Sequence, residues 1–510
     1  MKNLKLYMKN ALGRILIILL AAFVEFSIYY LVFDWFYDEL LYFEAIVRIL
    51  SVLLILYIIK NSKHLSMDLF WILMIVAFPI AGTIAYFFLG ANLRISRIFR
   101  SIIKKTEEAK QYYVQDPKVM KDLNTLDPYR KGQFAYISDS QGYPFYRNSD
   151  FDYYPFGELG YEAMLEDLKK AENFIFLEYF IIQEGKMWDG ILEILEEKAR
   201  AGVDVRVLYD DLGSFFLLPA NYAQTLEGKG IKCVSFNRLN PLLNIIVNHR
   251  DHRKIMVIDG KIAYSGGVNL ADEYINAKEV LGRWKDNVIR IKGDAVYSYT
   301  IMFLTHWNAL RNQDDDFSKF KVTARRRKSD GFIAPYGETP LDDEICAQNI
   351  YMNILNQASD YCYIYTPYLI IDTEMINALI LCAKRGVDVR LITPGIPDKK
   401  LVFMITQSYY SQLIEGGVKI FEYTPGFVHA KVFVSDDIVA TVGTVNLDYR
   451  SLYLHFENGT YLYGSEKIAD IKADLLEAME VGHEVTYEES KFPIFKEFFV
   501  SILRLFAPLM

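Results

Sequence analysis

Two short stretches decide the fold: HRKIMVID at residues 252–259 and HAKVFVSD at residues 429–436. Each has a histidine, then a lysine two residues later, then an apolar run that ends at an aspartate. With seven histidines, 56 basic and 64 acidic residues in 510, one such match is expected roughly 0.1 times by chance. Two matches therefore indicate that the chain contains two copies of one unit.

The sequence around these stretches repeats as well. Residues 202–207 read GVDVRV, and residues 386–391 read GVDVRL. In the first copy, the apolar run at 174–182 predicts a buried strand, and residues 188–201 predict an amphipathic helix. The same order of strand and helix returns after residue 361. Strands that alternate with helices are typical of an α/β fold, so we expect two copies of one α/β domain that face each other.

The composition limits the classes of function. At 510 residues, the chain is long enough for two or three units, each with its own core. A hydrophobic content of 52% is high for a purely soluble protein, and a net charge of −8 argues against a protein that coats nucleic acid. The four cysteines show no metal-ligand spacing and are interpreted as reduced core residues: Cys233, Cys346, Cys362 and Cys382.

Three apolar stretches open the chain, at Ile15–Phe33, Leu40–Ile59 and Leu69–Leu89. The first and third predict clean membrane spans. The second carries Glu44 and Arg48, which are costly in hydrocarbon, so a tilted span, a re-entrant segment and an interfacial helix are its alternatives. Together the stretches predict a multi-pass anchor in a cell membrane.

Basic residues flank this anchor on both sides. Lysines and arginines at residues 2–14 favour a cytoplasmic N-terminus, and those at residues 94–105 favour a cytoplasmic position after the last span. An even number of crossings satisfies both, and the second stretch is the candidate for not crossing fully. We therefore expect the rest of the chain to face the cytoplasm.

These patterns predict four regions. Residues 1–95 form the membrane anchor, residues 96–130 a polar linker, residues 131–325 the first domain and residues 326–510 the second. The aromatic-rich end, Phe492–Met510, fits an interfacial amphipathic helix or a helix packed on the second domain.

The candidate site residues suit phosphodiester chemistry. A histidine and a lysine two apart on a strand share one face, so His252 lies beside Lys254, and His429 beside Lys431. Such a pair of sites can surround one phosphodiester without a metal. One neutral histidine attacks phosphorus, while the other, protonated, gives its proton to the leaving alkoxide.

Further residues complete each copy. Asn269 and Asn446 follow Gly-rich turns and can donate hydrogen bonds to an anion. Asp286 and Glu457, a little downstream of the histidines, are candidates for orienting them. The last residue of each stretch, Asp259 or Asp436, is a catalytic candidate by its place in the motif, and a turn residue in the alternative interpretation.

The two stretches match the paired HxKx4D motifs of the phospholipase D superfamily, which the chain resembles over about residues 130–480. Within it, the chain resembles the longer, membrane-anchored bacterial cardiolipin synthases. The narrower resemblance rests on HRDHRK at 249–254, GGVN at 266–269 with Glu273 and Tyr274, GTVNLDYRS at 443–451, and AFPIAG at 77–82 before Tyr86 and Gly90.

The resemblance implies α/β/α sandwich domains, His252 as the nucleophile and His429 as the acid and base. It implies transfer of a phosphatidyl group from one phosphatidylglycerol to another, with release of glycerol and without cofactor or metal. Membrane lipids are the expected partners, and nucleic acid is not. Gly267 and Thr444 stand where many relatives have serine, and His455 where asparagine is common, so no role is assigned to these three positions.

Three alternatives stay open. A phospholipase D or a phosphatidylserine synthase would use the same chemistry with a different acceptor. A nuclease of the superfamily fits poorly with the acidic net charge and the membrane anchor. A membrane scaffold with a degenerate site would require missing catalytic positions, and both copies have all of them.

Overall fold

The computed structural model describes residues 23, 27, 37–62, 65–87, 97–238, 249–323 and 330–507. These residues belong to two compact units. The smaller unit contains the N-terminal helices and the end of the chain from Ser501, and the larger unit contains both copies of the repeat. The predicted span at Ile15–Phe33 lies outside the described residues, apart from two positions.

The second apolar stretch forms one long helix, α2, at Tyr37–Asn61. Among the described residues, its segment Tyr42–Asn61 is the one helix long and apolar enough to cross a membrane. The charges that made this stretch doubtful form an ion pair: Arg48 Nη2 lies 2.6 Å from Glu44 Oε1, one helical turn away. Pairing lowers the cost of both charges in an apolar medium.

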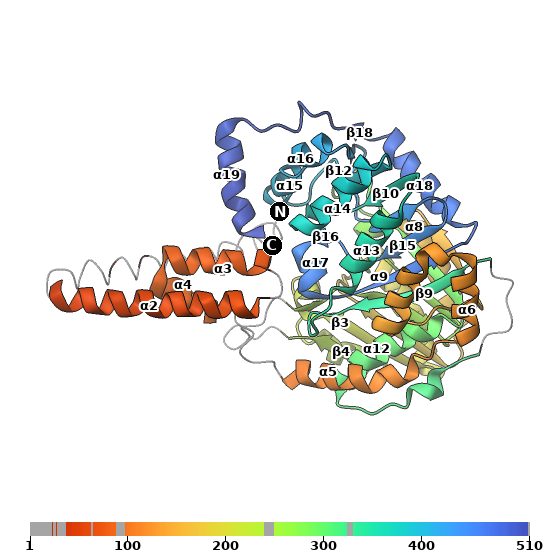
Figure 1. The fold of residues 1–510 in the computed structure, drawn as a ribbon. Helices are drawn as coiled ribbons and strands as arrows, with labels where there is room; N and C mark the ends of the chain where they lie inside the picture. The colour runs from red at the N-terminus through yellow and green to blue at the C-terminus, as the bar shows by residue number, and fades with distance from the viewer. Residues whose placement is uncertain are drawn as a thin grey trace. The chain divides into compact units, whose positions relative to one another are not determined.

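The prediction of a clean span at Leu69–Leu89 is not confirmed. Helix α3 (Leu65–Ala77) ends before Phe78, and helix α4 (Pro79–Ala85) begins at a proline. A proline has no backbone N–H and disfavours helical geometry in the residue before it, so it fits the first position of a new helix. In Figure 1, α2 lies beside α3 and α4. The described residues thus contain one candidate span and do not show a multi-pass anchor.

The first copy of the repeat forms a seven-stranded sheet in the order β1-β8-β7-β6-β2-β3-β4. Strands β2, β3 and β4 are parallel, and the other pairs are antiparallel. The strands are β1 Ser149–Tyr154, β2 Phe174–Tyr179, β3 Asp204–Asp210, β4 Lys232–Phe236, β6 Lys254–Ile258, β7 Ile262–Gly266 and β8 Val288–Gly293.

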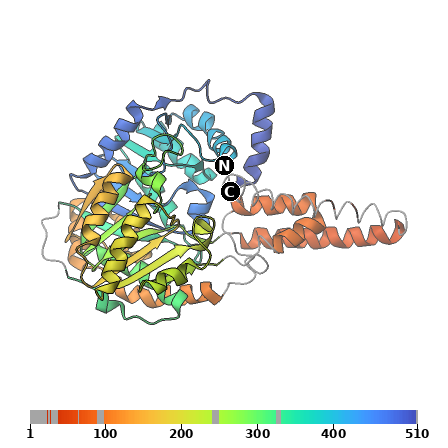
Figure 2. The same cartoon turned by 180° about the vertical axis from the view of Figure 1, so that it is seen from behind.

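Helices cover both faces of this sheet. Leu177 of β2 belongs to a buried cluster with Trp188 of α9 (Lys186–Arg200), next to α8 (Gly157–Leu168). Its neighbour Phe176 points the other way and stacks on Phe303 of α12 (Val296–Arg311), with ring centroids 4.6 Å apart. Figure 2 shows the yellow helices of this domain lying on one face of its strands. The domain is therefore an α/β/α sandwich.

The second copy repeats this topology. Its strands follow the order β9-β17-β15-β14-β10-β12-β13, and β18 (His483–Glu484) is added at the edge. Helices α13 (Cys346–Gln357), α14 (Thr373–Lys384) and α18 (Ile468–Glu480) correspond to α8, α9 and α12. The strands are β9 Phe332–Glu338, β10 Tyr361–Tyr365, β12 Asp388–Pro394, β13 Lys419–Tyr423, β14 Val432–Ser435, β15 Val439–Gly443 and β17 His455–Tyr463. The predicted duplication is confirmed.

Each domain sends a short segment into the other. Strand β5 (Arg250–Asp251) of the first domain pairs in parallel with the start of β17, and the His252 amide donates to the Phe456 carbonyl at 2.9 Å. In the reciprocal direction, the His429 amide donates to the Lys285 carbonyl at 2.7 Å. The backbone therefore joins the two domains at both histidines.

The predicted linker is helical and packed. Helix α5 (Arg97–Ala109) buries Phe99 and Ile102 and contacts α12, and Ser101 Oγ donates to the Ala309 carbonyl at 3.2 Å. The other helices and short strands are α6 Pro117–Leu126, α7 Lys131–Ala135, α10 Asp211–Ser214, α11 Tyr222–Gly228, β11 Leu369–Ile370, α15 Lys400–Gln407, α16 Tyr410–Glu415, β16 Leu447–Asp448, α17 Tyr449–Tyr453 and α19 Ile494–Leu505. In α19, only Val500 is buried, while Phe495 and Phe498 are exposed.

The aspartate at the end of each motif binds the backbone at the start of a neighbouring strand in its own domain. Asp259 adopts a left-handed φ of 51°, and its carboxylate accepts from the amides of residues 172, 173 and 174 at 2.7–2.9 Å. Asp436, with φ 57°, accepts in the same way from the amides of residues 359, 360 and 361. At about 3.3 Å per residue, Asp259 lies about 16 Å along the strand from Lys254. This placement favours the turn interpretation.

We predict that Asp259→Ala lowers the free energy of unfolding by roughly 2–4 kcal/mol, because three amides lose a charged acceptor and alanine tolerates the left-handed conformation poorly. Asp259→Asn is the matched control, since it keeps one acceptor oxygen and tolerates this conformation. The loss should therefore be smaller for asparagine. Thermal unfolding of the full chain in detergent measures both, and an alanine variant as stable as the parent would contradict this role.

Candidate active site

The two histidines lie just before their strands. His252 follows β5 and precedes β6, which begins at Lys254, while His429 and Lys431 precede β14. The prediction that each histidine sits on a strand is therefore wrong, although each lysine does contact the histidine of its own motif. Lys254 Nζ donates to the His252 carbonyl at 2.7 Å, and Lys431 Nζ donates to the His429 carbonyl.

Each histidine receives a carboxylate from the other domain. His252 Nδ1 lies 2.9 Å from both carboxylate oxygens of Glu457, and His429 Nδ1 lies 2.7 Å from Asp286 Oδ2. The sequence identifies both acids but cannot show that they cross over. A carboxylate at Nδ1 holds the proton on that nitrogen and leaves the Nε2 lone pair free.

Burial and neighbouring charges keep both histidines neutral. Burial lowers the pKa of His252 well below its usual range, and the ammonium groups of Lys254 and Lys431 lower it further. Burial, followed by the charge of Lys431, lowers the pKa of His429 to about 4. Because Lys431 of the second motif acts on His252 of the first, the two motifs share one electrostatic environment.

The lysines are equally buried. Removal from water lowers the pKa of Lys254 to about 7 and that of Lys431 to about 8, although Glu457 and Asp286 oppose this effect. In the described residues, their ammonium groups donate to the histidine carbonyls rather than to a carboxylate. A bound anion would therefore meet two cations that no ion pair neutralises.

Glu457 and Asp286 have different neighbours at two equivalent positions, residues 444 and 267, to which the sequence analysis assigned no role. Thr444 Oγ1 donates to Glu457 Oε2. At the equivalent Gly267, a Cβ atom would lie 1.9 Å from Asp286 Oδ1, so a side chain there would displace the partner of His429. Gly267 thus leaves room for the Asp286 carboxylate, and Thr444 donates a hydrogen bond to the Glu457 carboxylate.

The two asparagines lie inside the domains. Asn269 Oδ1 accepts from the Ile181 amide at 3.1 Å, and its Nδ2 donates to Tyr274 Oη at 2.8 Å. Asn446 Nδ2 donates to Asp448 Oδ2 at 3.1 Å. Each amide nitrogen has a second hydrogen, so these contacts leave one donor for an anion.

Aromatic side chains surround the imidazoles, and of these the sequence analysis named Tyr274 but gave it no role at the site. The Phe180 ring lies 4.9 Å from the His252 ring, and the rings of Tyr274 and Trp284 lie 5.3 and 5.9 Å from the His429 ring, as centroid distances. Their apolar surfaces keep water from the two histidines. Residue type alone does not indicate these contacts, because aromatic residues are common throughout the chain.

His455 is a third histidine in this site. Its ring centroid lies 5.6 Å from that of His252, and its Nδ1 lies 3.7 Å from Glu457 Oε1. Burial lowers the pKa of His455 to about 3. Among the described residues, neither of its ring nitrogens has a hydrogen-bond partner.

A second buried cluster lies around His306, on α12. Its Nδ1 is 2.9 Å from Glu178 Oε1 and 3.5 Å from Asp251 Oδ2, and Arg253 Nη1 is 3.7 Å from Glu178 Oε1. Burial, followed by the charge of Asp251, raises the pKa of Glu178 to about 7. This network lies beside β5, and its own cations neutralise the carboxylates.

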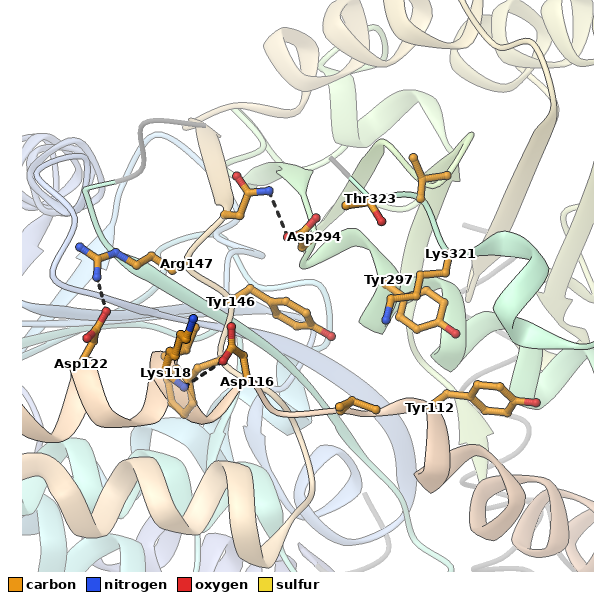
Figure 3. A pocket seen from close by; sticks show the side chains of 15 residues that line it. Tyr112, Asp116, Lys118, Asp122, Tyr146, Arg147, Asp294, Tyr297, Lys321 and Thr323 are labelled. Carbon is orange, nitrogen blue, oxygen red and sulfur yellow. Dashed lines mark hydrogen bonds and ion pairs between the residues drawn. The ribbon is translucent and has the colours of Figure 1, made fainter. Parts of the chain in front are cut away.

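A cavity of about 950 Å³ lies elsewhere, between the first domain and a segment that includes the first half of α6 (Figure 3). Tyr112, Asp116, Tyr146, Tyr297 and Lys321 are among the residues that line it, and Asp122 pairs with Arg147 at its edge. None of the histidines or lysines of the two motifs lines this cavity. The paired motifs, rather than the cavity, therefore define the candidate active site.

Comparisons with known proteins identify the family of the chain. A family model described as "Cardiolipin synthase, PLD-like domain" matches residues 164–307 and 351–479, and one described as "Phospholipase_D-nuclease N-terminal" matches residues 49–90. The chain is 44% identical to an uncharacterized protein of Streptococcus mutans, over 89% of this chain and 99% of that protein. It is 32% identical to a cardiolipin synthase of Alkalihalophilus pseudofirmus, over 91% of this chain and 93% of that protein.

A solved structure supports the fold. The phosphatidylserine synthase of Haemophilus influenzae matches with a TM-score of 0.53 and 15% identity, over 70% of this chain and 93% of that one. At this identity, the likeness concerns the fold alone. The family match covers more than half of the chain and includes both histidine–lysine motifs. The chain therefore belongs to the family of cardiolipin synthases built from phospholipase D-like domains.

Proposed function

We propose that the protein is a cardiolipin synthase: it transfers the phosphatidyl group of one phosphatidylglycerol to a second and releases glycerol. The observation that carries this proposal is the reciprocal pairing of His252 with Glu457 and of His429 with Asp286. It gives two neutral imidazoles and two buried ammonium groups in one environment. The curated relatives named cardiolipin synthase supply the substrate class.

In the first half-reaction, Nε2 of His252 attacks phosphorus, and the bond from phosphorus to the glycerol oxygen breaks. His429 donates a proton to that oxygen, so glycerol leaves neutral and a phosphatidyl-histidine remains. The assignment of His252 as nucleophile rests on the family resemblance. Binding of the anionic diester offsets the positive field of the lysines, which raises the pKa of His429 and allows it to carry the proton.

In the second half-reaction, neutral His429 takes the proton from the hydroxyl of a second phosphatidylglycerol, and that oxygen attacks phosphorus. The bond to His252 Nε2 breaks, which regenerates the free imidazole and forms cardiolipin. Lys254 and Lys431 stabilise the charge on the equatorial oxygens in both steps, and Asn269 and Asn446 add hydrogen bonds. Glu457 and Asp286 act as positioning residues, since each holds a histidine by its Nδ1–H.

We propose that α2 anchors the chain in a bacterial cell membrane, where both lipids are concentrated. We propose an even number of crossings, with α2 as one of them and the apolar stretch at residues 15–33 as the sequence candidate for another. The break before Pro79 is consistent with a segment that does not cross. Both basic flanks would then lie in the cytoplasm, together with the two catalytic domains.

Labelling of an engineered cysteine tests this orientation. All four native cysteines are buried, so background labelling should be low, and Lys121 of α6 is exposed. A membrane-impermeant maleimide should not label Lys121→Cys in intact cells and should label it after lysis. Ready labelling in intact cells would place the domains on the outer side.

We predict that His252→Ala and His429→Ala each lower turnover by at least about 10³-fold, and that the double variant is little worse than either single one. The reason is that one histidine cannot both attack phosphorus and protonate the leaving group in the same step. His483→Ala is the matched control, because the His483 side chain is exposed and pairs with Glu489 at the surface, away from both motifs. Two half-active single variants would instead indicate two independent sites.

Anion affinity should fall as the pH rises through 7 to 8. A lysine is cationic below its pKa, and burial lowers these values to about 7 for Lys254 and about 8 for Lys431, so the free site loses its positive charge in this range. Sulfate keeps its charge over the same range and can be titrated calorimetrically against the purified chain. Lys254→Met should remove most of the pH dependence between 7 and 8, whereas Lys472→Met on α18 should not. An affinity that stays constant to pH 9 would contradict the assignment.

Phosphatidylglycerol alone, in mixed micelles with a chelator and no nucleotide, should yield cardiolipin and glycerol in equal amounts. The exchange conserves one phosphodiester bond, so it needs no external energy source, and added glycerol should drive it backward. Mass analysis of the lipids and an assay for glycerol measure the two products. Phosphatidic acid as the main product would show that water is the acceptor, and the synthase assignment would fail although the two-histidine chemistry survived.

A further inference from the structure

His455 is a buried side chain that the proposed mechanism does not use. Its exposed fraction is 8%, and in the described part of the chain neither imidazole nitrogen has a hydrogen-bond partner. A buried polar group without a partner costs free energy, so an unused imidazole beside a catalytic residue calls for an explanation.

The unused imidazole faces two other ligand groups. Ligand atoms of His252, His455 and Glu457 all lie within 4.8 Å of one another. Glu457 Oε1 is 2.9 Å from His252 Nδ1 and 3.7 Å from His455 Nδ1, while Thr444 holds the other oxygen, Oε2. Ligands about 2.0–2.1 Å from a tetrahedral ion are about 3.3–3.5 Å apart. The two separations from Glu457 Oε1, 2.9 Å to His252 Nδ1 and 3.7 Å to His455 Nδ1, lie just below and just above this range.

We propose that His252, His455 and Glu457 form an inhibitory site for Zn²⁺. Two imidazoles and one carboxylate form a donor set that zinc accepts with water as its fourth ligand. Magnesium and calcium prefer oxygen ligands and fit this set poorly. The other buried group of this kind, Glu178 with Asp251 and His306, carries the guanidinium of Arg253 nearby and is not proposed to bind an ion.

The consequence for catalysis, which rests on the proposed function, follows from the two nitrogens of one imidazole. During turnover, His252 keeps its proton on Nδ1, hydrogen-bonded to Glu457, and attacks with the lone pair of Nε2. Zinc needs the lone pair of Nδ1, so the proton must move to Nε2. No proton is lost overall, yet the nucleophilic lone pair disappears. Zinc should therefore lower the maximal rate even at saturating lipid.

Binding can be measured without lipid. The full chain in detergent is titrated with Zn²⁺ in competition with a chromophoric chelator, and His455→Asn is compared with the parent. Loss of an outer-shell partner already costs about 10- to 100-fold in metal affinity, so loss of a direct ligand should cost at least about tenfold. His483→Asn is the matched control, since its imidazole lies 3.1 Å from Glu489 at the surface and would report adventitious binding. Unchanged affinity in His455→Asn would overturn the proposal.

A second measurement does not depend on any variant. X-ray absorption at the zinc edge of the parent loaded with one equivalent should show two imidazole ligands, and one or none would overturn the proposal. In the turnover assay, Zn²⁺ should inhibit the parent reversibly, a chelator should restore it, and His455→Asn should need at least about tenfold more zinc. If the chain binds zinc through His455 but makes no cardiolipin, the proposed function fails and the metal site stands. If the chain makes cardiolipin but zinc inhibits His455→Asn as strongly as the parent, the proposed function stands and the metal site fails.

Discussion

The structure depends on a hydrogen bond that each histidine makes with a carboxylate of the opposite domain. The His252–Glu457 and His429–Asp286 contacts span 205 and 143 residues of sequence. All four side chains are buried, where a carboxylate without a hydrogen-bond partner is costly, so each acid depends on the histidine of the other domain. The backbone pairing of β5 with β17, and of Lys285 with residues 428 and 429, brings these groups together. The catalytic site is thus a property of the domain interface and belongs to neither domain alone.

Much of this arrangement could be predicted from the two repeated sequence motifs. The succession of strand and helix along the chain, the duplication and the candidate histidines, lysines and acids follow from two copies of one motif. The crossing of the acids could not be predicted, because the sequence does not say which copy a side chain will reach. The roles of Gly267 and Thr444 were missed for a similar reason: each is explained by a contact with the acid of its own domain, and that acid matters only through the other domain's histidine.

The membrane segment shows where composition misleads. Glu44 and Arg48 made the second apolar stretch doubtful when each residue was counted separately, yet they lie one turn apart and pair. The third stretch has no charge between Leu69 and Leu89 and fits a clean span by composition, yet Pro79 divides it into two short helices. The ion pair explains the first case and the proline explains the second, and mean hydropathy detects neither feature.

The reciprocal contacts also determine when activity can appear during synthesis. Domains emerge from the ribosome in order and often fold as they emerge. A first domain that has folded early already carries His252, Lys254 and Asp286, but Glu457 lies 205 residues further along the chain. Until that residue is made and docked, His252 lacks the partner that holds its tautomer. Under the proposed mechanism, a nascent or truncated chain therefore lacks a complete site, and activity requires that the second half be made and folded.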